Sequence, residues 1–107
     1  MDQPSSSRNP ALVALVKRIS QGDESAVGQL YDMTSSIVYG LALRILGEAS
    51  NAEEVVLDVY TQVWRQAATY DEARGAPLAW LLTIARTRSV DRLRSGWQTG
   101  RPFVGRW

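Results

Sequence analysis

The side chains with the most chemical potential in this sequence are carboxylates and arginines, in different parts of the chain. Glu54 and Asp58 lie one helical turn apart, which suits acid–base chemistry or the binding of a cationic partner. Four arginines fall within nine residues nearer the other end and could bind phosphate groups: Arg86, Arg88, Arg92 and Arg94. The sequence contains no His and no Cys, which excludes imidazole bases, thiol nucleophiles and Cys/His zinc sites.

An acid–base enzyme is the weakest interpretation of the carboxylates. The candidates are Glu53, Glu54 and Asp58, and a solvated helix face lacks the desolvation that tunes a catalytic acid. No Gly-rich phosphate-binding loop is present either. We therefore expect a protein that is not an enzyme and that uses no cofactor, metal ion or small-molecule substrate.

The formal charge of +1 is unevenly distributed. Residues 1–73 carry five basic and ten acidic side chains, a net charge of −5, whereas residues 74–107 carry seven Arg and one Asp, a net charge of +6. A basic block at one end attracts phosphates whatever the total charge, although such asymmetry also arises by chance in small proteins. We expect the two halves to bind different partners.

Length and composition indicate one ordinary folded domain. The 107 residues include 45% apolar and 21% charged side chains. No apolar run is long enough to span a membrane, and the opening residues lack the pattern of a secretory signal. The absence of Cys fits a reducing compartment. We expect a cytoplasmic monomer.

Hydrophobic periodicity predicts an all-α fold, a small bundle of about four helices that position these side chains. The first helix follows Pro10. The second starts at an Asp23 cap and is continuous, or broken once near Thr34. The third is capped by Ser50 or Asn51, and the last runs from Leu78 to about Arg94. We expect residues 1–10 to be a disordered tail, 11–96 one helical domain, and 97–107 the start of a linker or tail.

The third helix has the cleanest pattern. A core stripe is predicted at Ala52, Val55, Val56, Val59, Tyr60, Val63, Trp64 and Ala67. The remaining face carries an acidic strip beside the apolar Leu57. A loop follows from Tyr70 to Pro77, and the last helix is apolar first and cationic last.

Three segments in this order carry a resemblance: GDESAVGQLYD, NAEEVVLDVYTQVWRQAATYD and APLAWLLTIARTRSVDRLRS. Over about residues 11–96 the chain resembles the second region of bacterial RNA polymerase sigma factors of the extracytoplasmic-function (ECF) group. The resemblance implies a helical domain that binds core RNA polymerase and recognises and melts the minus-ten promoter element as single-stranded DNA. It also implies an anti-sigma factor as a partner.

The resemblance places polymerase binding, to the clamp helices of the largest subunit, on Glu54, Leu57, Asp58 and Gln62. An acidic face suits a basic coiled-coil partner. Family members commonly have Gln at the position of Leu57, so an apolar contact replaces a polar one here. A helical protein–protein adaptor without DNA binding is the alternative, in which the arginines serve only capping and solubility.

The resemblance places DNA binding on the loop and the last helix, where a non-template base is flipped into a loop-lined pocket. The residues are Asp71, Arg74, Trp80, Arg86, Thr87, Arg88, Arg92 and Arg94. Thr87 stands where many members have a base-reading Asn, and Trp80 is either core or a stacking platform. The family's fourth-region helix-turn-helix is absent after Arg94. We expect a truncated piece of a longer protein, the alternative being a natural stand-alone domain.

Overall fold

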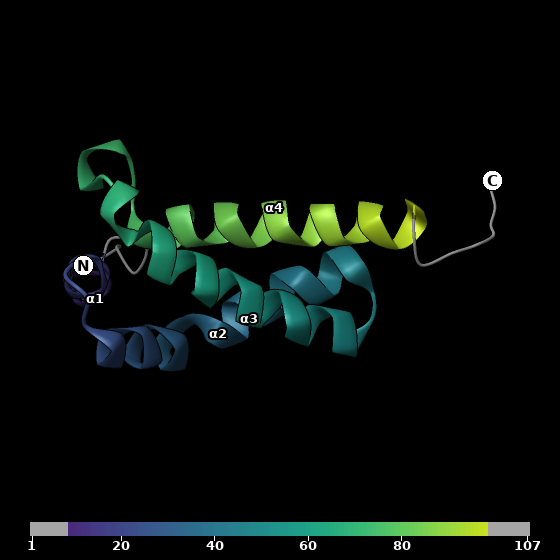
Figure 1. Cartoon of the computed structure of the whole chain (residues 1–107), viewed down its shortest axis with the longest axis horizontal. Coiled ribbons are helices and arrows are strands. Elements are labelled where there is room, and N and C mark those ends of the chain that lie inside the picture. Colours follow the sequence, from purple (N-terminus) through teal and green to yellow (C-terminus); the bar gives the residue numbers. More distant parts are fainter. Residues whose placement is uncertain (1–8, 99–107) are drawn as a thin grey trace.

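The computed structural model describes residues 9–98, with side chains through residue 95 (Figure 1). Four helices form the bundle: α1 (Pro10–Ser20), α2 (Glu24–Leu46), α3 (Ala49–Gln66) and α4 (Pro77–Gln98). Two 3₁₀ turns, η2 (Ala67–Thr69) and η3 (Glu72–Arg74), lie between α3 and α4. No strand occurs in this range, so the predicted all-α class is confirmed. Of the expected tail (residues 1–10) and linker (residues 97–107), residues 1–8 and 99–107 lie outside the described residues. Pro10 already belongs to α1, and α4 continues to Gln98.

The helix ends follow local sequence signals, with one exception. Asn9 caps α1, and Asp23 caps α2 as predicted, its carboxylate accepting from the Ser25 backbone N–H at 3.0 Å. Hydrogen bonds from Ser25 and Arg18 lower the pKa of Asp23. Gly47 ends α2 at φ 73°, a left-handed conformation that favours glycine.

The start of α3 corrects a prediction. Ser50 and Asn51 do not cap this helix, because both lie in its first turn, and Glu48 occupies the N-cap position without a side-chain cap. The Asn51 amide group instead donates to Glu48 and accepts from Arg92 of α4. The Asn51 side chain, which the sequence pattern assigned to the helix cap, therefore makes a tertiary contact with α4 instead.

The core lies where α2, α3 and α4 pack together, with α1 lying against α2 and the η2 turn. The predicted stripe of α3 is buried, with the exception of Trp64, which is 40% exposed. Successive residues of a helix are about 100° apart, so Trp64 lies at the edge of the stripe centred on Val59 and Val63. The prediction that Trp64 belongs to the core is wrong.

A buried polar pair joins α2 to α3. The Thr34 and Tyr60 hydroxyl oxygens lie 2.6 Å apart, and the Thr34 hydroxyl donates to the Leu30 carbonyl at 2.7 Å. Burial raises the pKa of Tyr60 to about 12. The Thr34 hydroxyl bonds within its own helix, and α2 continues through this segment unbroken.

Within the described range, no helix combines the length and the apolar character that crossing a membrane requires.

Candidate functional site

The outer face of α3 carries the acidic strip that the sequence predicts. Glu54 and Asp58 are exposed on this face, and Gln62 is half-buried. Leu57 is 63% exposed, more than any other large apolar side chain in the described range. An apolar side chain this exposed between two carboxylates is suited to a partner that is both apolar and cationic.

Leu57 also borders a groove of about 510 Å³ between α2 and α3. The groove is lined by Tyr31, Ser35, Ser36, Tyr39, Glu53, Val56 and Leu57. Glu53 of α3 is its one charged lining residue, and the α2 wall adds tyrosine and serine side chains beside the acidic α3 face. Sequence reasoning missed the α2 wall, because no local pattern says which part of α2 lies beside Leu57.

Two of the four predicted phosphate-binding arginines contact α3. Arg88 Nε donates to Gln62 Oε1 at 2.7 Å. Arg92 Nε donates to Asn51 Oδ1 at 3.0 Å, and Arg92 Nη2 lies 2.5 Å from Glu54 Oε1. Residues that the sequence assigned to separate partners are thus joined across one helix pair.

The other two arginines, Arg86 and Arg94, are exposed on α4. Neither side chain takes part in an ion pair within the described residues. Since no carboxylate of the described residues is paired with them, their guanidinium groups can bind phosphate.

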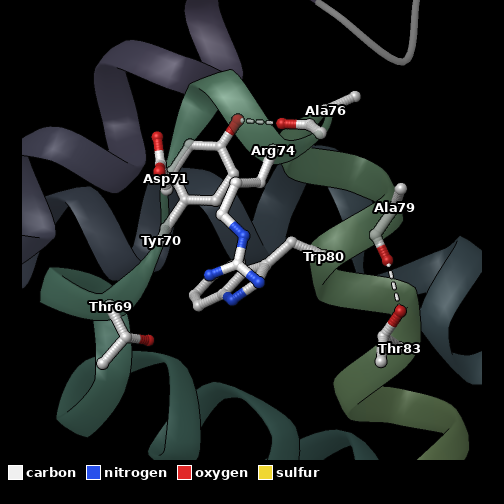
Figure 2. A pocket seen from close by; sticks show the side chains of 9 residues that line it. Thr69, Tyr70, Asp71, Arg74, Ala76, Ala79, Trp80 and Thr83 are labelled. Carbon is white, nitrogen blue, oxygen red and sulfur yellow. Dashed lines mark hydrogen bonds between the residues drawn. The ribbon is translucent and has the colours of Figure 1, made fainter.

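A second hollow, of about 340 Å³, lies where the loop meets the first turns of α4 (Figure 2). It is lined by Thr69, Tyr70, Asp71, Arg74, Gly75, Ala76, Ala79, Trp80 and Thr83. The Tyr70 and Trp80 ring centroids are 5.3 Å apart with their planes tilted by 53°. Figure 2 shows the Arg74 side chain extending into the space beside Trp80. Two aromatic rings and a guanidinium group can hold a planar, electron-rich ligand.

The loop that forms this hollow is held in shape by its own residues. The Tyr70 hydroxyl donates to the Gly75 carbonyl at 2.8 Å, and the Asp71 carboxylate accepts from the Ala73 backbone N–H at 3.0 Å. Gly75 adopts φ 156° and ψ 170°, a combination open almost only to glycine. Tyr70 is therefore both a wall of the hollow and a brace of the loop.

The structure brings together three of the predicted DNA-binding residues, Asp71, Arg74 and Trp80, at this hollow. Thr87 is exposed on α4 but does not line it, whereas Thr83, one turn earlier, does. Sequence reasoning missed Thr83, although its i, i+3 spacing from Trp80 could have revealed a shared face. Trp80 is half-buried: it packs against the core and also lines the hollow. This position is compatible with both predicted roles, core packing and base stacking.

The Sigma-70 region 2 family model matches residues 30–99. The chain is 46% identical over 88 residues to the ECF RNA polymerase sigma factor SigK of Mycobacterium ulcerans (strain Agy99), covering 82% of this chain and 47% of that protein. SigK of Mycobacterium bovis (strain BCG / Pasteur 1173P2) is 46% identical over 83 residues, 78% of this chain and 44% of that protein. The chain spans about half the length of the curated relatives it matches.

Proposed function

Because this chain belongs to the sigma-70 region 2 family, as a region 2 domain of the ECF sigma factor type, we propose that it binds two partners during transcription initiation. Core RNA polymerase binds the outer face of α3, and single-stranded minus-ten promoter DNA binds the loop hollow and α4. The observation that carries the proposal is the hollow itself, in which Tyr70, Arg74 and Trp80 converge at the start of an arginine-rich helix.

The polymerase side is supported by the chemistry of the α3 face. Glu54 and Asp58 are exposed on both sides of Leu57, and the adjoining groove gives an apolar side chain of the partner a place to enter. A basic helical partner, such as the clamp helices of the largest polymerase subunit, is complementary in charge to this surface. A regulator of the anti-sigma type that covered the same face would block polymerase binding.

The DNA side is supported by what base flipping requires. Taking a base out of the stack costs about a few kcal/mol, which stacking and phosphate contacts must offset. The aromatic pair at 5.3 Å offers ring faces for one base, and Arg74 lines the same hollow. The exposed Arg86 and Arg94 supply cations for the DNA backbone further along α4.

A protein that reads chromosomal promoters acts in the bacterial cytoplasm.

The polymerase half is tested by charge reversal on α3. We expect Asp58→Arg to weaken binding to purified core RNA polymerase at least tenfold, because a cation would face the basic partner. Asp91→Arg, the same change at an exposed position of α4, is the matched control and should bind like the wild type. Equal binding by all three proteins would remove α3 from the interface, and no binding by the wild type would favour a helical adaptor.

The DNA half is tested at the hollow rather than at Arg88 or Arg92, because both of those side chains also hold α4 on α3. Arg74→Gln removes one charge from the hollow, and Lys17→Gln removes one from the exposed side of α1. We expect only Arg74→Gln to weaken binding of a labelled single-stranded oligonucleotide, measured by fluorescence anisotropy. An adaptor without a DNA site would show no difference between the two variants.

A further inference from the structure

The polar contacts between α3 and α4 connect the two surfaces that the proposed function assigns to different partners. Glu54 belongs to the polymerase face and Arg92 to the DNA face, yet their charged groups lie 2.5 Å apart. The Arg92 side chain is 34% exposed and the Glu54 side chain 60% exposed, so solvent and partners can reach both. Neither group is fully available while the other holds it.

We propose that the Arg92–Glu54 ion pair couples polymerase binding to DNA binding, and this inference rests on the proposed function. A cationic group of the polymerase that binds Glu54 competes with Arg92 and releases its guanidinium group for a DNA phosphate. A phosphate that binds Arg92 releases the Glu54 carboxylate in the same way. Coupling between binding sites is reciprocal, so each partner raises the affinity for the other by the same factor.

Arg92 is singled out by the charge of its partner. Arg88 also contacts α3, but its acceptor is the neutral amide of Gln62, which leaves the positive charge of Arg88 uncompensated. The bond from Arg92 to the Asn51 amide oxygen holds its guanidinium group against α3 without neutralising it. Glu54 is therefore the group that lowers the attraction of Arg92 for phosphate, and competition for Glu54 restores it.

The effect is expected to be modest and sensitive to salt. Ion pairs at this degree of exposure change equilibria by about two- to fivefold. Such pairs weaken as the ionic strength rises, because salt screens exposed charges. The coupling should therefore be measured near 50 mM salt or below, and it should shrink towards no effect at several hundred millimolar.

The DNA arm of the test uses the chain without polymerase. Glu54→Gln keeps the shape of the side chain and removes its charge, so we expect about two- to fivefold tighter binding of a labelled single-stranded oligonucleotide. Asp32→Asn, which removes one negative charge from an exposed position of α2, is the matched control and should have a smaller effect. In an Arg92→Gln background the gain from Glu54→Gln should disappear. Equal gains from both carboxylate variants, or weaker binding by Glu54→Gln, would overturn the proposal.

The polymerase arm tests reciprocity. Arg92→Gln should bind purified core RNA polymerase about two- to fivefold more tightly than the wild type, because Glu54 no longer has a competing cation. Arg44→Gln, at an exposed position of α2, removes the same charge elsewhere and should leave the affinity unchanged. Weaker or equal binding by Arg92→Gln would overturn the coupling. If the wild type binds both partners but the variants change neither affinity, the coupling alone is overturned. If the wild type does not bind DNA, the DNA half of the proposed function is overturned and the coupling with it.

Discussion

Removing one partner of the Thr34–Tyr60 hydrogen bond should cost more than removing the other. Thr34 is 2% exposed and Tyr60 5% exposed, and their oxygens lie 2.6 Å apart. Because the Thr34 hydroxyl donates to Leu30, the Tyr60 hydroxyl donates to Thr34. Thr34→Val therefore strands a buried donor, at a cost of about 1–3 kcal/mol in the free energy of unfolding.

Tyr60→Phe removes the donor itself and leaves Thr34 bonded to Leu30. We expect this variant to lose about 0.5–1.5 kcal/mol, the net value of an ordinary hydrogen bond. The double variant should lie close to Tyr60→Phe, because no donor is left unsatisfied once the phenol is gone. The order of stability is therefore wild type, then Tyr60→Phe and the double variant together, then Thr34→Val.

Urea unfolding at pH 7, followed by far-ultraviolet circular dichroism, measures these differences. The midpoints should shift while the dependence on urea concentration stays constant, because the surface exposed on unfolding hardly changes. A Thr34→Val variant as stable as Tyr60→Phe would refute the reasoning, since it would mean that the Tyr60 hydroxyl finds another acceptor. Polymerase binding by Tyr60→Phe should equal that of the wild type, because the outer face of α3 is untouched.

Three further predictions concern the same bundle. Burial raises the pKa of Tyr60 from 10.0 to about 12, so the phenol ionises in the unfolded state before it does in the folded state. The free energy of unfolding should therefore be unaffected by this group below pH 10 and fall by about 2–3 kcal/mol as the pH rises to 12, and Tyr60→Phe should lack this alkaline loss. Leu81→Ala should lower the unfolding free energy by about 2–5 kcal/mol in urea titrations, because Leu81 is 2% exposed in the core, and a loss below 1 kcal/mol would contradict this packing. Trp80→Ala should weaken single-stranded DNA binding by about 1–3 kcal/mol in anisotropy titrations, whereas unchanged affinity in a folded variant would exclude stacking at the hollow.

Much of the fold could be predicted from local patterns. Asp23, Gly47 and Pro77 mark helix ends in the sequence and in the structure, because caps and helix-breaking residues act on backbone groups a few positions away. The buried stripe of α3 follows from apolar spacing for the same reason. The error at Trp64 shows the limit of this reasoning, because a residue at the edge of a stripe is buried only if a neighbouring helix covers it.

The candidate site could be predicted only in part from local sequence patterns. Spacing identified the acidic face of α3 and the cationic end of α4 as separate features. It could not show that Thr83, and not Thr87, lines the hollow beside Trp80, because that depends on where the loop lies against α4.

Four helices, their boundaries to within a few residues, and the charge that each presents follow from local sequence patterns, because helical hydrogen bonds and caps connect residues close together in the chain. The packing of the helices is what brings Arg92 to Glu54 and Asn51, across about forty residues of sequence, and what places Tyr70 and Trp80 at one hollow. These contacts depend on how the helices cross and pack, and no spacing along one helix encodes that geometry.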